Sequence, residues 1–312
     1  MPELFLGIDT SNYTSSCAVY NKDEDSFVSL KKLLPVNEGQ LGLRQSDAVF
    51  HHTKNLPPLL YELVSGCNEI SCVSASFAPC DREGSYMPCF SVGQGFGKVL
   101  SGAYNSKYYE FSHQAGHVAA AIHSSGHTEL IDKEFLAFHV SGGTTEILYV
   151  KPDTDKPFEI TQIASTLDLK AGQAVDRAGV MMGLKFPAGP ELDKLANMSD
   201  KQYKIRPFTK DGCCSFSGLE NQCRKMLSNG EQQCDVAKYC IDYVCTAVRI
   251  MTQDALKKYG ELPVVFAGGV MSNSIMRKVL SQEFGAYFAN PEFSSDNAAG
   301  TAYLGYIKEY CR

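Results

Sequence analysis

The chain contains one arrangement twice: an apolar strand that ends in small or polar residues, followed by a strand that returns alongside it. The first copy covers residues 4–11 and returns over 13–20, and the second covers 135–143 and returns over 146–150. An apolar strand, a polar turn and a β-branched or aromatic return are typical of a β-hairpin. The repeat therefore predicts two similar halves, each built on a sheet with antiparallel strands.

Helices and further strands are expected between these hairpins. Apolar residues fall at helical spacing from 46 to 63, although Pro57-Pro58 interrupt this segment. Short strands are predicted at 73–77 and 264–267, and further helices at 93–104, 171–182, 235–259, from 273 onward, and 297–310. Strands that alternate with helices in two similar halves predict an α/β fold with mixed sheets.

Composition limits the class of protein. A chain of 312 residues accommodates two domains of ordinary size. Its 44% hydrophobic and 21% charged residues are those of a globular protein, which excludes disordered, collagen-like and coiled-coil classes. The net charge of −6 argues against a generally basic nucleic-acid-binding surface, although a local basic groove is compatible with it.

The twelve cysteines do not indicate a disulfide scaffold, because they are spread over a long chain without zinc-ribbon spacing. The start, Met1-Pro2-Glu3, does not resemble a secretory leader, and no window has the roughly 18 apolar residues of a spanning helix. We therefore expect a cytoplasmic protein whose thiols act mainly as small buried side chains.

Two strand ends are followed by glycine pairs, in residues 141–145 and 267–270. Glycine allows a phosphate to approach the backbone, although a single pair is more typical of an ordinary turn. Asp9-Thr10-Ser11 forms a third polar strand end. Three such ends together favour a nucleotide cleft between two domains.

His113 and His117 are four residues apart, so a helix would present both imidazoles on one face. The alternative is a pair of exposed or hydrogen-bonded histidines. Asp296 is the candidate third ligand, and its alternative role is a helix N-cap. Two histidines and one carboxylate suit a transition metal such as iron or zinc. The other candidates have no such spacing and are interpreted as surface histidines: His51, His52, His123 and His127.

An ordered set of motifs along nearly the whole chain resembles the universal tRNA threonylcarbamoyladenosine transferase family, long filed as O-sialoglycoprotein endopeptidases. The motifs lie at residues 7–11, 113–117, 139–143, 171–176, 187–190, 215–219, 267–273 and 295–298. The resemblance implies an actin-like ATPase fold, with two duplicated ribonuclease-H-like domains around a nucleotide cleft. It places the first domain at 1–112 plus the closing helix 298–312, and the second, with the metal and nucleotide sites, at 113–297.

The resemblance also implies an acyltransferase activity. The family moves a threonylcarbamoyl group from threonylcarbamoyl-AMP to N6 of adenosine 37 in tRNAs that read ANN codons, with helper subunits. His113, His117 and Asp296 would hold one metal ion, usually iron, acting as a Lewis acid. ATP or threonylcarbamoyl-AMP, with Mg²⁺ as a further candidate, would contact Asp9, His139, Val140, Ser141, Gly142, Gly143, Asp176, Gly189, Asp193 and Asn273. No catalytic side chain is assigned.

Several positions depart from the family pattern. An Asp-Glu pair is replaced by residues 12–15, a Gly-Pro-Gly loop by residues 78–85, and the acidic residue between the two histidines by 114–116. Thr144 and Glu220 replace a common His and a common Lys. The chain therefore resembles a divergent paralogue. Two alternatives stay open: a carbamoyl transferase of the same fold with another acceptor, and a non-catalytic nucleotide-binding regulatory protein.

Overall fold

The computed structural model describes residues 3–11, 13–35, 43–293 and 297–311. Its contacts form two compact units: unit 1 is Met1–Ile131, Pro152–Glu159 and Glu292–Arg312, and unit 2 is Asp132–Lys151 and Ile160–Pro291. Residues 113–131 cluster with unit 1, whereas the predicted boundary put them in the second domain. The reason is that helix α3 (His113–Ser125) packs against the closing helix α9 (Ala298–Tyr310), which itself lies on the first sheet.

Unit 1 is built on a mixed five-stranded sheet. Strand β1 pairs antiparallel with β2 and parallel with β4, as expected for a hairpin followed by a helical crossover. The three central strands are buried along almost their whole length, whereas β3 is largely exposed. The order across the sheet is β3 (Ser26–Leu33), β2 (Thr14–Asn21), β1 (Leu4–Asp9), β4 (Cys72–Ala78) and β5 (Lys107–Ser112).

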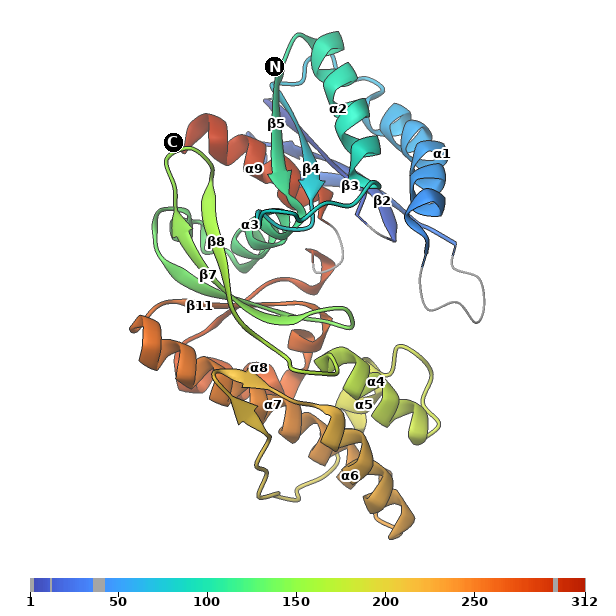
Figure 1. Cartoon of the computed structure of the whole chain (residues 1–312), viewed down its shortest axis with the longest axis vertical. Helices are drawn as coiled ribbons and strands as arrows, with labels where there is room; N and C mark the ends of the chain where they lie inside the picture. The colour runs from blue at the N-terminus through green and yellow to red at the C-terminus, as the bar shows by residue number, and fades with distance from the viewer. Residues whose placement is uncertain (1–2, 12, 36–42, 294–296, 312) are drawn as a thin grey trace. The chain divides into compact units, whose positions relative to one another are not determined.

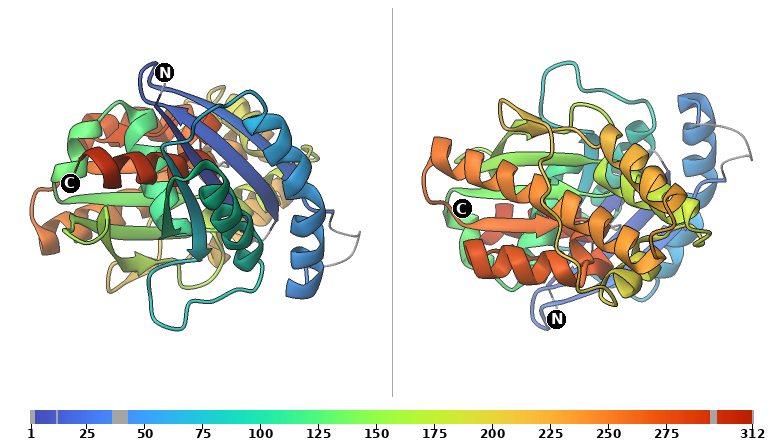
Figure 2. Two further views of the ribbon diagram at one scale, coloured as in Figure 1. Left: turned by 90° about the horizontal axis from the view of Figure 1, so that it is seen from above. Right: turned by 90° about the horizontal axis from the view of Figure 1, so that it is seen from below.

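Helices cover both faces of this sheet. Helices α1 (Gln45–Val64) and α2 (Phe90–Tyr104) lie on one face, and α9 lies on the other (Figures 1 and 2). Helix α1 continues through Pro57 and Pro58, although the sequence predicted an interruption there. It buries Leu56 and Leu60 on either side of the proline pair, so packing against the sheet maintains the helix.

Helices α3 and α9 cross at a pair of glycines. A Cβ atom added at Gly300 would lie 1.9 Å from the backbone oxygen of Gly116. Any larger residue at position 300 would therefore push the two helices apart. This close crossing fixes the N-terminal turn of α3 beside the start of α9.

Unit 2 repeats the sheet of unit 1. Strand β6 pairs antiparallel with β7 and parallel with β11, which corresponds to the pairing of β1 with β2 and β4. The order is β12 (Tyr287–Phe288), β11 (Val264–Ala267), β6 (Phe135–Val140), β7 (Thr145–Pro152) and β8 (Phe158–Ser165). The prediction of an α/β fold with mixed sheets is therefore confirmed.

The core of unit 2 lies between this sheet and its helices. Leu136, Phe138 and Phe266 of the sheet and Val244 and Val248 of α7 belong to one buried cluster. The helices of unit 2 are α4 (Ala171–Met181), α5 (Gly189–Ala196), α6 (Ser217–Ser228), α7 (Gln233–Tyr259) and α8 (Ser274–Phe284), and a small hairpin joins β9 (Thr209–Lys210) to β10 (Cys213–Cys214).

Two further observations concern the whole described chain. Its twelve cysteines are free thiols, and seven of them are buried. Within the ranges given above, none of the helices combines the length and the apolar character that crossing a membrane requires.

Candidate functional site

A pocket of about 530 Å³ opens in unit 2. This volume lies in the range of small-molecule sites, which is roughly 300 to 1,000 Å³. Five residues expected to contact a nucleotide line it, namely Gly142, Asp176, Gly189, Asp193 and Asn273. Other lining residues were not expected from the sequence, among them Gly172, Val175, Lys194 and Ile241. Gly172 and Val175 belong to the motif at residues 171–176, so this motif could have indicated both of them as pocket residues.

The turn after β6 forms one wall of this pocket. Its backbone closes through a hydrogen bond from Ser141 N to Thr144 O (2.7 Å), and the Ser141 hydroxyl accepts from Thr144 N at 3.1 Å. Gly172 packs directly beneath the turn, since a Cβ there would lie 2.6 Å from Gly142 N. Around Gly142 itself no atom lies within 4 Å of an added Cβ. The turn is therefore fixed by its own hydrogen bonds and leaves open space beside Gly142.

The polar residues of the pocket are fixed by hydrogen bonds to helix starts. Asn273 Nδ2 donates to Asp193 Oδ1 at 2.7 Å, and Asn273 Oδ1 accepts from Met276 N at 3.0 Å as the N-cap of α8. Asp193 also accepts from Ser274 N at 3.2 Å. Asp176 Oδ1 accepts from Ala188 N at 2.8 Å, just before α5. These bonds hold the side chains in one arrangement before any ligand binds.

The remaining predicted nucleotide contacts do not line this pocket. Val140 is fully buried at the end of β6, and His139 precedes it on the same strand, half-buried. Ser141 and Gly143 belong to the turn itself. Asp9 belongs to unit 1, at the end of β1, where its carboxylate contacts His113.

The two predicted metal histidines lie together at the start of α3. Ser112 caps this helix by accepting from Ala115 N at 3.2 Å, so His113 and His117 occupy successive turns on one face. Their Nε2 atoms are 3.1 Å apart. Two nitrogens bound to one metal at about 2.0–2.1 Å would be separated by roughly 2.9–3.4 Å. The pair therefore fits a shared metal ion.

A third ligand is not found within the described ranges, where no group of three His, Cys, Asp or Glu side chains forms a metal site. The predicted third ligand, Asp296, lies outside the described residues. The donor set can therefore be assessed only for the histidine pair.

Asp9 and Asn297 surround the other side of His113. Asp9 Oδ1 lies 3.2 Å from His113 Nδ1. Asn297 Nδ2 donates to His113 O at 2.6 Å and also lies 2.7 Å from His113 Nδ1. Burial raises the pKa of Asp9, but the electrostatic interaction with the His113 imidazole and hydrogen bonds from His113, Ser76 and Ser11 outweigh it and hold this pKa below its usual range. An ionised Asp9 that accepts from Nδ1–H would leave the Nε2 lone pair of His113 available to a metal, an arrangement common in metal sites.

The interpretation as surface histidines is wrong for His52, and His123 is also largely covered, because its side chain is 13% exposed and packs against Phe27 and Tyr303. His52 is completely buried in α1, with its Nδ1 2.8 Å from the Ser15 hydroxyl, although it was interpreted as a surface residue. It lies on the face of α1 that packs on the first sheet, because it is four residues before the buried Leu56. Burial lowers the pKa of His52 to about 4.

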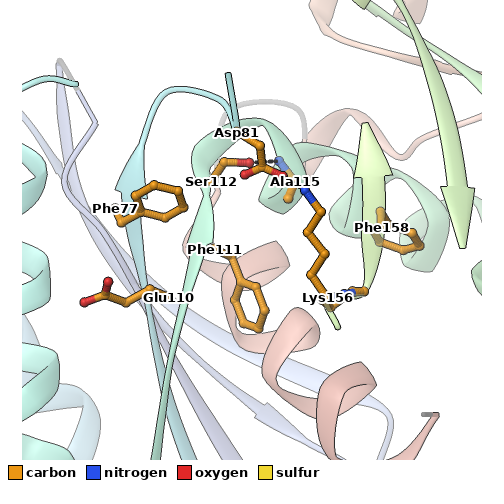
Figure 3. A pocket seen from close by; sticks show the side chains of 9 residues that line it. Phe77, Asp81, Glu110, Phe111, Ser112, Ala115, Lys156 and Phe158 are labelled. Atoms are coloured by element: carbon orange, nitrogen blue, oxygen red, sulfur yellow. Dashed lines mark hydrogen bonds and ion pairs between the residues drawn. The ribbon is translucent and has the colours of Figure 1, made fainter. Parts of the chain in front are cut away.

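A second pocket, of about 250 Å³, lies in unit 1 (Figure 3). Phe77, Phe111 and Phe158 contribute apolar walls, and Lys156 Nζ reaches Asp81 Oδ2 at 3.0 Å. Asp81 belongs to the segment that replaces the expected Gly-Pro-Gly loop. The same segment contacts α3, since Pro79 O accepts from Gln114 N at 3.0 Å. This pocket is smaller than usual ligand sites. The Gln114–Pro79 hydrogen bond holds the replacement loop against the helix that carries His113, and the ion pair joins the loop to the segment of Lys156 between β7 and β8.

Comparisons with known proteins indicate the family of the chain. A family model described as tRNA N6-adenosine threonylcarbamoyltransferase matches residues 40–303. A relative of that name from Sulfurihydrogenibium sp. is 30% identical over 96% of this chain and 89% of its own length. Another from Thermosipho africanus is 30% identical over 97% of this chain and 93% of its own.

Similar solved structures show the fold. Component A of the (R)-2-hydroxyglutaryl-CoA dehydratase from Acidaminococcus fermentans has a TM-score of 0.56 and 18% identity, covering 98% of both chains. HypF from T. kodakarensis has a TM-score of 0.60 and 12% identity, over 99% of this chain and 48% of its own. These are actin-like ATPase folds, which confirms the predicted fold. Since the family model covers most of the sequence, the chain belongs to the tRNA N6-adenosine threonylcarbamoyltransferase family and is a transferase.

Proposed function

We propose that this enzyme moves a threonylcarbamoyl group from threonylcarbamoyl-AMP to N6 of adenosine 37 in tRNAs that read ANN codons. The observation that carries the proposal is the unit 2 pocket, because five residues expected to contact the adenylate line it. Two proteins of the same fold are described with nucleotides, namely HypF in its phosphate- and nucleotide-bound form and a 2-hydroxyisocaproyl-CoA dehydratase activator with bound ADPNP.

The pocket has a suitable region for each part of an adenylate. Val175, Pro187 and Ile241 supply apolar surface for a purine ring. Asp176 and Asn273 supply polar groups for the ribose, and the open backbone at Gly142 supplies an approach for phosphate. ATP would use the same surfaces, with Mg²⁺ as a further candidate ligand.

A metal ion held by His113, His117 and Asp296 is the second part of the proposal. When bound, it would supply Lewis-acid stabilisation of negative charge that develops during acyl transfer. Iron is the family's usual metal, and zinc also accepts two imidazoles and a carboxylate. Asp9 would hold His113 in the required tautomer.

The proposed acceptor, a tRNA, determines which partners the chain needs. A chain of net charge −6 needs a local basic surface or another subunit to hold tRNA, so helper subunits belong to the proposal. An enzyme that modifies tRNA is expected to work in the cytoplasm.

The experiment is transfer of labelled threonine from purified threonylcarbamoyl-AMP to a transcript of an ANN-reading tRNA. The control transcript carries guanosine in place of adenosine 37 and therefore lacks the acceptor amine. Because residues 78–85 and Thr144 depart from the family pattern, we expect slow transfer by the chain alone and faster transfer with helper subunits. Label in the control transcript, or no label in either transcript with helper subunits present, would contradict this acceptor and favour a carbamoyl transferase with another one.

A further inference from the structure

An extended segment of unit 2, residues 203–210, alternates between buried and exposed side chains. Tyr203, Ile205 and Pro207 point inward, and the first two pack on the core of unit 2. The outward positions are Lys204, Arg206, Phe208 and Lys210. We name these four side chains the basic strip.

The inward side chains fix this segment against α7 and the hairpin of β9 and β10. The Tyr203 hydroxyl donates to Asp235 O at 3.1 Å, and the Tyr203 ring packs edge-on against Tyr239. Phe208 O accepts from Ser215 N at 3.1 Å. Because burial alternates with a period of two, as in an extended chain, the four side chains of the strip share the outward side of the segment.

The charges of the basic strip are not neutralised by neighbouring side chains. In the part of the chain that the structure describes, the side chains of Lys204, Arg206 and Lys210 make no hydrogen bond or ion pair. The neighbouring acidic residues are used elsewhere: Asp235 and Glu231 pair with Lys201 at 2.8 and 3.5 Å. Asp211 lies beyond the strip at the hairpin turn, where it lines a small pocket with Lys258.

An exposed aromatic ring stands among these cations. The side chain of Phe208 is 60% exposed, between Arg206 and Lys210 on the outward side. Cations that follow a phosphate backbone, together with an aromatic ring on which a base stacks, are the combination used by proteins that bind single-stranded nucleic acid.

We infer that the basic strip is an RNA-binding surface, on which Lys204, Arg206 and Lys210 contact phosphates and Phe208 stacks on an unpaired base. The inference rests on the proposed function, because the RNA would be the acceptor tRNA. Tyr203 contacts one face of α7 at Asp235 and Tyr239, whereas the pocket is lined by Ile241, about half a turn further round the helix. The strip therefore lies over a different face of α7 from the adenylate pocket, and on it we place a part of the tRNA other than the reacting nucleoside.

The experiment measures binding of an unmodified ANN-reading tRNA transcript to the full chain over a series of KCl concentrations. One variant combines Lys204→Ala, Arg206→Ala and Lys210→Ala. Its control combines Lys133→Ala, Lys257→Ala and Lys278→Ala, three exposed lysines of unit 2 without a partner among the described residues, so that both variants have the same net charge.

The strip variant should bind at least about tenfold more weakly, and its plot of log affinity against log salt should be shallower by about 2 to 3. The control should keep the wild-type slope. Phe208→Ala should weaken binding about tenfold without changing the slope, and Phe208→Tyr should restore affinity. In transfer assays the strip variant should raise KM for tRNA and leave kcat unchanged. An unchanged stability increase with ATP would show that unit 2 is still folded.

The outcomes separate the inference from the proposed function. Equal slopes for wild type and strip variant, with tRNA bound by both, would overturn the inference alone. An equal reduction in the control variant would also overturn it, because the attraction would then belong to the whole surface. A wild-type protein that binds no tRNA, even with helper subunits, would remove both the inference and the proposed acceptor.

Discussion

Asp9 Oδ1 and His113 Nδ1 lie 3.2 Å apart although 104 residues separate them in the sequence. The carboxylate is buried and also accepts from the Ser11 hydroxyl at 2.7 Å, so it is fixed at the end of β1. The contact joins the first strand of unit 1 to the helix that carries both candidate metal ligands.

Asp9→Asn should therefore weaken metal binding by about 10- to 100-fold, as loss of a partner that orients a ligand commonly does. The measurement is a Co²⁺ titration followed by visible absorption, with metal content after purification as a second readout. His117→Ala should lose more metal affinity than Asp9→Asn, because it removes a ligand. Glu110→Gln, which alters a carboxylate of unit 1 paired with Lys98, is the control and should bind Co²⁺ normally. Equal Co²⁺ affinities for wild type and Asp9→Asn would show that the contact does not orient a ligand.

Gly142→Val should abolish nucleotide binding without destabilising the protein. No atom lies within 4 Å of a Cβ at this position, so the side chain would enter the pocket rather than the core. Wild-type protein should melt at a higher temperature with ATP, since a ligand at a hundred times its Kd adds about 2.7 kcal/mol. The variant should show no such increase. Gly218 has similar open space but lies outside the pocket, so Gly218→Val should keep the ATP-induced rise in melting temperature. A full rise in both variants would show that the nucleotide binds elsewhere.

His52 should make the protein less stable in mild acid. Its pKa is about 4 in the folded state and about 6.5 in the unfolded chain, so below pH 6.5 only the unfolded chain takes up the proton. The stability that His52 contributes is therefore present above pH 6.5 and falls by roughly 2 kcal/mol at pH 5, given the folded pKa of about 4. Urea unfolding of wild type and His52→Gln between pH 7.5 and 5 measures the effect. The variant should lose less stability than wild type, and parallel curves would contradict the prediction.

Asp168 should stabilise the start of α6, for which Phe216 provides no side-chain cap. Its carboxylate accepts from Phe216 N at 2.9 Å and Ser217 N at 3.3 Å. Partial burial raises the pKa of Asp168, but hydrogen bonds from Ser215, Ser217, Phe216 and Leu169 outweigh it and hold this pKa well below its usual range.

Asp168→Ala should lower the free energy of unfolding by about 1 kcal/mol at pH 7, a modest effect because the side chain is exposed. A carboxylate of lowered pKa stabilises the fold above its unfolded pKa of about 3.9, and this stabilisation disappears as the pH falls further. The difference between variant and wild type should therefore narrow below pH 4. Asp200, an exposed residue of unit 2 without a partner among the described residues, is the control, and Asp200→Ala should change stability by only a few tenths of a kcal/mol.

The sequence predicted the centre of each sheet and missed its edges. The three middle strands, β2, β1 and β4 in one sheet and β7, β6 and β11 in the other, were expected, because buried strands are apolar runs. The outer strands β3, β5, β8 and β12 were not expected. Strand β3 contains Lys31 and Lys32 and is largely exposed, so its residues have no apolar pattern to detect.

The site was predictable to a similar extent. The spacing of His113 and His117 indicated their common face, and the motifs indicated five lining residues of the pocket. The contact between Asp9 and His113 depends on two strands and a helix crossing, which no local pattern encodes. The basic strip was also missed, because its alternation lies in a segment without regular secondary structure apart from β9.

The crossing of α3 and α9 at Gly116 and Gly300 has a consequence for biosynthesis. The first sheet is covered on one face by α9, which follows all five strands of that sheet and all of unit 2 in the sequence. A ribosome therefore completes β1 to β5 long before it supplies the helix that covers them. One face of the first sheet therefore lacks its covering helix while nearly two hundred further residues, including all of unit 2, are synthesised. Loss of α9 would thus uncover the first sheet, although all five strands of that sheet would still be present.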